Sequence, residues 1–194
     1  MPAALVAAAA LASCSSGDNG DGTEGNVFVN RPAGISITVP DGWRASAGRL
    51  TGLLDPRERL VLTSFPIAGI ARSPGCSPAG LLRQIPRSGV AALLLEYMHT
   101  GARRNLPPRP ARFHLGPGIR GGFDCFSPQP FGRAHLVNFG DSGRAFQLLV
   151  AVGKTATPEM RVTAAKALDS LRIEPCDTPL PSETDPTCRR PLPH

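Results

Sequence analysis

The residues with the clearest potential for chemistry are Asp141 and Ser142, which lie in the stretch Gly140-Asp141-Ser142-Gly143. A serine hydroxyl becomes a nucleophile when a neighbouring base takes its proton. His135 and His114 are the two histidines that could supply such a base in this half of the chain. The sequence therefore raises the hypothesis of a secreted hydrolase that uses Ser142.

The same four residues also have the composition of a tight turn. The stretch resembles the nucleophile segment of trypsin-like serine proteases, but Arg144 stands where that family has a second glycine, and no matching histidine segment is present. The domain is also too short for the two barrels of that family. Gly, Asp and Ser between two alternating apolar runs are typical of a β-hairpin turn. We therefore favour a turn over a catalytic segment, and expect no catalytic residue here.

The remaining chemistry-bearing residues do not form a recognisable metal or cofactor site. No two histidines are spaced three or four residues apart, which a helical metal site would require; they are His99, His114, His135 and His194. We therefore expect no metal and no cofactor.

The densest group of basic residues is a candidate contact for anions. It consists of Arg103, Arg104, Arg109 and Arg112, and prolines interrupt it. The chain has 21 Lys and Arg against 15 Asp and Glu, which gives a formal charge of +6. Because no aromatic residues are interleaved for base stacking, the group does not predict nucleic-acid binding. It does allow an electrostatic adaptor for anionic lipid or wall polymer.

The N-terminal region carries a candidate export and anchoring signal. An apolar run of alanines and leucines ends in Leu11-Ala12-Ser13-Cys14, and the following residues are rich in Ser, Gly and Asp. This resembles the lipobox of bacterial lipoproteins. The resemblance implies a signal peptide over 1–13, a diacylglyceryl group on Cys14, and a location at the outer face of the cytoplasmic membrane. Two acyl chains give stable anchoring where one does not. Residues 14–25 then form a flexible tether.

The other cysteines are even in number, which in an exported protein predicts disulfides. They are Cys76, Cys125, Cys176 and Cys188. Three connectivities are open, and we favour Cys76–Cys125 within the domain and Cys176–Cys188 in the tail.

The elements that must position these residues follow from periodicity. Apolar residues alternate over 35–39 and predict a strand, followed by the turn Pro40-Asp41-Gly42 and a strand that begins at Trp43. Further strands are expected over 59–67, 89–98, 111–116 and 121–127, with 89–98 central because it is apolar on both faces. A short helix is expected over 77–85, with Ser77 as N-cap.

The last third of the chain has the strongest local signals. The stretches 133–139 and 144–153 predict a hairpin. Thr157-Pro158 begins a helix that we expect to continue to Ile173. Its apolar stripe consists of Met160, Ala164, Ala167, Leu168 and Leu171. The proline-rich segment 175–194 is expected to be a tail, which leaves 26–174 as a single domain.

This order of elements predicts an α+β fold with a largely antiparallel sheet. It resembles the PsbP-like α-β-α sandwich, on the strength of Ile35 to Trp43 and Ala167 to Ile173. Members of that group are mostly binding or assembly factors. The resemblance therefore implies a non-enzymatic envelope lipoprotein that binds a protein or a small apolar ligand. The serine hydrolase and the electrostatic adaptor are the alternatives.

Overall fold

The computed structural model describes residues 26–48, 50–67, 69–70, 72–98, 106–116 and 132–175. Two antiparallel sheets and two helices make up these residues, which confirms the expected α+β class. The larger sheet has five strands in the order β3 (Arg44–Ser46), β4 (Arg57–Thr63), β5 (Val90–Tyr97), β7 (Arg144–Val152), β6 (Arg133–Asp141). The smaller sheet has the order β1 (Val27–Asn30), β2 (Ile35–Thr38), β8 (Arg172–Ile173).

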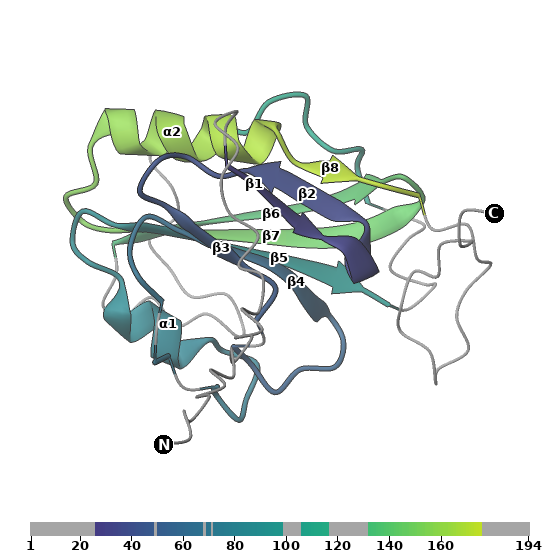
Figure 1. Cartoon of the computed structure of the whole chain (residues 1–194), viewed down its shortest axis with the longest axis horizontal. Coiled ribbons are helices and arrows are strands. Elements are labelled where there is room, and N and C mark those ends of the chain that lie inside the picture. The colour runs from purple at the N-terminus through teal and green to yellow at the C-terminus, as the bar shows by residue number, and fades with distance from the viewer. Residues whose placement is uncertain are drawn as a thin grey trace, which may run out of the picture.

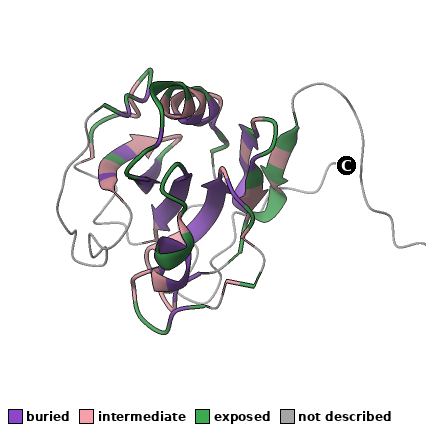
Figure 2. Cartoon of the chain, turned by 90° about the vertical axis from the view of Figure 1, so that its left-hand side faces the viewer, coloured by how far each residue is buried: buried purple, intermediate pink, exposed green. Residues whose placement is uncertain are grey.

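The two helices lie on opposite faces of the large sheet. Helix α2 (Pro158–Asp169) covers one face, together with the small sheet, and helix α1 (Ala79–Gln84) lies on the other (Figure 1). The strands between them are mostly buried, as Figure 2 shows in purple. The described residues therefore form layers around a sheet that is covered on both sides.

The central strands are buried on both faces because each contributes alternate residues to two separate clusters. From β5, Ala92 and Leu94 pack toward α2 and the small sheet, whereas Leu93 and Leu95 pack toward α1. Such strands read as continuous apolar runs rather than as alternating ones. This confirms the prediction that 89–98 is a central strand.

The hairpin and the second helix also form where the sequence predicts them. β6 and β7 pair from Arg133↔Val152 to Asp141↔Arg144. Helix α2 begins after Thr157, whose hydroxyl accepts a hydrogen bond from the Met160 amide, with proline in its first turn. The cap and the proline that begin this helix act locally and need no distant partner.

The end of the second helix differs from the expectation. The helix ends at Asp169 rather than at Ile173, and Arg172–Ile173 forms β8, which pairs with β2. Ser170 sits at the junction, where its hydroxyl donates to the Ala167 carbonyl and accepts from the Thr38 amide. Leu171 is buried as expected, but it lies after the end of the helix; Ile173, also buried, pairs with Ile35 of β2.

Three further expectations need correction. Residues 111–116 form no strand: Phe113 and Leu115 alternate because both side chains enter the core. Ser77 is not the N-cap of α1, which starts after Pro78, and the Gly80 amide instead donates to the Ser73 hydroxyl. The strand expected over 59–67 runs from Arg57 to Thr63.

Two more differences separate the expected strands from the observed ones. Trp43 immediately precedes β3 instead of lying within it, and strand β1 was not predicted from the sequence. The strand expected over 121–127 lies outside the described residues.

Candidate functional site

The predicted nucleophile lies in the turn of the β6–β7 hairpin. Ser142 has φ 52° and Gly143 has φ 70°, so both central residues adopt the left-handed conformation. Positive φ at both positions is the requirement of a type I′ turn, the turn that matches the twist of a two-residue hairpin. The interpretation of Gly140-Asp141-Ser142-Gly143 as a hairpin turn is confirmed.

The Ser142 hydroxyl contacts groups that hold the fold together. Its oxygen lies 2.8 Å from the Ile173 carbonyl oxygen and 3.0 Å from Asp141 Oδ1, and its single proton is shared between these acceptors. The contact with Ile173 ties the turn to β8. This serine is therefore part of the junction between the two sheets.

The structure does not bring Ser142 together with His135. That histidine pairs with Val150 in the body of β6, about 20 Å along the strand from the turn. His114 is exposed in the 106–116 segment, and no hydrogen bond joins it to Ser142 within the described part of the chain. His135 is therefore too far along the strand to take the serine proton.

Arg144, the residue that departs from the protease pattern, lies in a buried ion cluster. Its Nε and one terminal nitrogen donate to the two oxygens of Glu96, at 2.8 and 2.7 Å. Arg59 Nε donates to the same carboxylate at 2.6 Å. The three side chains are 1–5% exposed. Burial alone would raise the pKa of Glu96, but the hydrogen bonds and charges of Arg144 and Arg59 outweigh it and hold that pKa below its usual value.

The cluster also anchors the small sheet. The other terminal nitrogen of Arg144 donates to the carbonyls of Ala33, at 2.8 Å, and Glu174, at 3.1 Å. The guanidinium lies 5.0 Å from the centre of the Phe146 ring, which is within cation–π range. Arg144 therefore links β7 to Ala33, just before β2, and to Glu174, which follows β8.

Arg109, predicted as an anion contact, makes a second set of links at the same junction. It donates to Asp141 Oδ2 at 3.1 Å, to the Leu171 carbonyl at 2.6 Å and to the Asp169 carbonyl at 3.3 Å. These contacts occupy its guanidinium within the fold. Arg112 is exposed, and Arg103 and Arg104 lie outside the described residues.

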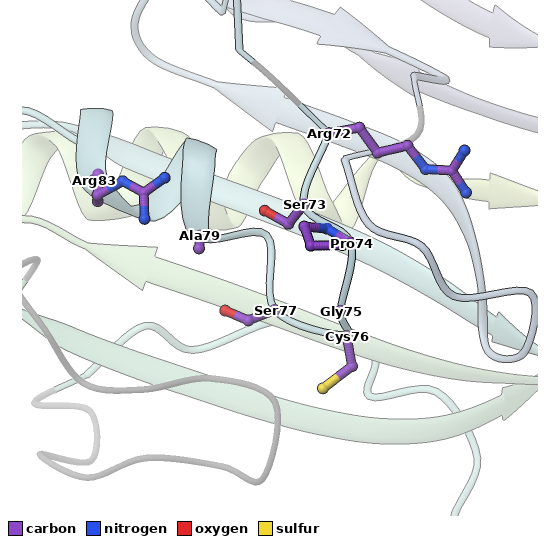
Figure 3. A pocket seen from close by; sticks show the side chains of 8 residues that line it. All are labelled: Arg72, Ser73, Pro74, Gly75, Cys76, Ser77, Ala79 and Arg83. Atoms are coloured by element: carbon purple, nitrogen blue, oxygen red, sulfur yellow. The ribbon is translucent and has the colours of Figure 1, made fainter.

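A pocket of about 430 Å³ lies where the loop before α1 meets that helix (Figure 3). Nothing in the sequence indicated this pocket, because its lining residues do not form a recognisable motif. The lining carries two exposed arginines, Arg72 and Arg83, and no carboxylate; the other lining residues are Ser73, Pro74, Gly75, Cys76, Ser77 and Ala79. A cationic pocket without an acidic residue favours a ligand that carries negative charge.

The loop that forms this pocket is held against residues 50–52. Arg72 Nε donates to the Thr51 carbonyl at 2.7 Å, and the Gly52 amide donates to the Gly75 carbonyl at 3.1 Å. A Cβ on residue 52 would lie 2.5 Å from the Pro74 carbonyl oxygen, so this close approach requires glycine. The backbone of the pocket is therefore fixed in position by the neighbouring loop.

His135 has a cationic environment beneath α2. Burial lowers its pKa, and the charges of Arg161 and Arg133 lower it further. Its Nε2 is buried and has no hydrogen-bond partner. Burial and the two positive charges all favour the neutral form of the imidazole.

Several predicted features lie outside the described residues. They include Cys14 with its tether and Cys125, Cys176 and Cys188, so lipidation and both disulfides stay predictions. Within the described ranges, no group of three or more metal-ligating side chains occurs, and no helix is long and apolar enough to cross a bilayer.

Comparison with known proteins gives no match: no family model, no curated protein and no solved structure is significantly similar to this chain.

Proposed function

We propose that this chain is a non-enzymatic binding module of the cell envelope, anchored by lipid on Cys14, which holds a small ligand in the pocket over 72–83. The observation that carries the proposal is the pocket itself, with Arg72 and Arg83 and no opposing carboxylate. The PsbP-like architecture is part of the same proposal. The arrangement of α1 and α2 on opposite faces of one antiparallel sheet supports it.

The ligand class follows from the lining. Arg83 lies on α1, and Ser73 and Ser77 lie on the loop before it (Figure 3). Arg72 also lies on this loop, but its side chain extends away from the two serines and its Nε donates to the Thr51 carbonyl. Hydroxyls and guanidinium groups donate hydrogen bonds to carboxylates and phosphates, while Pro74 and Ala79 offer apolar contact. A small molecule with one anionic group and a short apolar body matches these groups.

The engagement of Ser142, Asp141 and Arg144 in the fold supports a binding role over hydrolysis. Each of these side chains holds one part of the chain to another, as their contacts with Ile173, Arg109 and Glu96 show. The Ser142 hydroxyl makes its hydrogen bonds with the Ile173 carbonyl and the Asp141 carboxylate, and none with a histidine of the described residues.

The ligand proposal is tested with a matched pair of probes, hexanoate and hexanol, titrated into the full chain while amide chemical shifts are followed. We expect hexanoate to shift the amides of 72–83 and hexanol to shift them much less. Arg83→Ala should weaken hexanoate binding by about two- to fivefold, the range of an exposed charge pair.

Arg87→Ala is the matched control, because Arg87 is an exposed arginine just beyond α1 and outside the lining. It should leave hexanoate binding unchanged. Equal shifts for the two probes, or equal weakening by the two arginine variants, would contradict the proposed site.

A further inference from the structure

Strand β1 is an edge strand with exposed apolar side chains. It pairs only with β2 in the three-stranded sheet of the described chain. Val27 is 55% exposed and Val29 is 49% exposed, whereas Phe28 packs against the core. Exposed edge strands of this composition are templates for pairing with another strand.

The hydrogen-bond alternation shows which backbone groups are available at this edge. The Val39 amide donates to the Asn26 carbonyl, so 26 and 39 form a hydrogen-bonded pair. Bonded and non-bonded pairs alternate along an antiparallel ladder. Phe28 and Asn30 are therefore bonded to β2, and the amides and carbonyls of Val27 and Val29 point away from it.

The sequence of the edge reads the same in both directions. Residues 26–30 are Asn-Val-Phe-Val-Asn, and the centre of this palindrome is Phe28. In a two-fold antiparallel pairing centred on Phe28, Val27 of one copy lies opposite Val29 of the other, and the reverse. The amides and carbonyls of Val27 and Val29 are also the ones that point away from β2. The register that pairs the valine side chains therefore also pairs the available backbone groups.

The charged residues and prolines that often prevent edge pairing do not occur in this strand. Residues 26–30 contain no lysine, no proline and no charged residue. The register of β1 with β2 runs without a bulge from Val27↔Thr38 to Asn30↔Ile35. A second copy therefore meets no charge repulsion along the strand, and opposed β-branched residues on one face favour the pair.

From these observations we infer that β1 is a self-complementary interface, through which two copies of this chain pair edge to edge and join their small sheets into one continuous antiparallel sheet. The inference is independent of ligand binding at 72–83 and of anchoring at Cys14. The contact is small, so the dimer is a weak one whose population depends on protein concentration.

The test is sedimentation equilibrium of the full chain between about 10 µM and about 1 mM, a range that covers weak association. We expect a monomer at the low end and a growing dimer population at the high end. Val29→Lys should weaken association by about tenfold or more, because each dimer then carries two charges in the interface. Val162→Lys is the matched control, since Val162 on α2 is 52% exposed and lies outside the small sheet.

Amide hydrogen exchange of the wild-type chain gives a readout that does not depend on whether the variant folds. The amides of Val27 and Val29 should exchange more slowly as concentration rises, while the Phe28 amide, already bonded to β2, should not change. A monomer over the whole range would overturn the inference. A dimer in which Val27 and Val29 exchange at a constant rate, or which Val162→Lys weakens as much as Val29→Lys does, would overturn it too.

Discussion

At Arg144 a single buried guanidinium joins three parts of the chain. It binds Glu96 on β5, the Ala33 carbonyl before β2 and the Glu174 carbonyl after β8. Arg144 and Arg59 both bind the Glu96 carboxylate at this site, and all three side chains are held away from water. Removing the charge of Glu96 breaks both of these buried ion pairs at once.

Glu96→Gln is therefore expected to destabilise the fold by about 3–5 kcal/mol, the cost of breaking a buried ion pair. The pKa of Glu96 is lower in the folded chain than the reference value of 4.5. Its contribution is thus present above pH 4.5 and lost as the pH falls through the folded pKa. Urea unfolding between neutral and acidic pH should show this loss in the wild type and less of it in the variant. Asp41→Asn, at an exposed turn residue, is the control and should leave both the stability and its pH dependence nearly unchanged.

The hydroxyl of Ser142 stabilises the fold, whereas its left-handed backbone conformation destabilises it. Two substitutions separate these two effects. Ser142→Ala removes the contact with Ile173 but keeps a side chain at φ 52°. We expect it to cost about 1 kcal/mol, the net value of one hydrogen bond. Ser142→Gly removes the same contact but relieves the left-handed strain, which is worth about 1 kcal/mol for a non-glycine residue. Thermal unfolding should therefore rank glycine above alanine; the reverse order would show that the backbone at 142 is not strained.

At the scale of elements, β8 is held in place by groups outside its own strand. It has two residues, and its neighbours in the chain accept hydrogen bonds from Arg109 and Arg144. A strand of two residues forms few backbone hydrogen bonds with its neighbour. Hydrogen bonds from side chains therefore supply much of the stability that holds it in place. The junction between α2 and the small sheet therefore depends on arginines from distant segments.

Arg109→Ala should loosen this junction. We expect a loss of about 1–3 kcal/mol, since a charged donor to several acceptors is removed, and faster amide exchange at Leu171 and Ile173. Arg112→Ala is the control, because Arg112 is a nearby arginine that is exposed. If both variants exchange as the wild type does, the contacts of Arg109 do not hold β8.

At the scale of the whole molecule, the large sheet separates two apolar clusters. One contains residues of α2 and the small sheet, and the other contains residues of α1 and the loop that precedes it. The β1 edge belongs to the first side and the pocket to the second, which keeps pairing and ligand binding on separate parts of the fold. Occupation of one site is therefore expected to leave the other accessible.

The predicted anchor and disulfides are tested together by intact mass spectrometry of the chain purified from its native membrane. We expect a chain that begins at Cys14, with the added mass of a diacylglyceryl group and the loss of hydrogen that two disulfides require. Reduction should restore the hydrogens and leave the lipid in place. An unmodified chain with free thiols would contradict export, anchoring and the predicted disulfides.

Several elements could be predicted from local signals in the sequence. The hairpin is specified by glycine and polar residues between alternating runs, and α2 by Thr157 and Pro158 at its start. The central position of β5 follows from apolar residues on both of its faces. In each case the free energy that selects the structure lies within a few residues, so the pattern is sufficient.

Elements and sites that depend on distant partners could not be predicted from the sequence. Alternating apolar residues report burial and not hydrogen-bond partners. For this reason the strand predicted over 111–116 was wrong, and Arg172–Ile173 is a strand only because β2 lies beside it. Arg144 and Glu96 are 48 residues apart, and no local signature marks such a pair. The pocket over 72–83 and the available edge of β1 likewise arise from the packing of separate segments. They become visible only when the chain is folded.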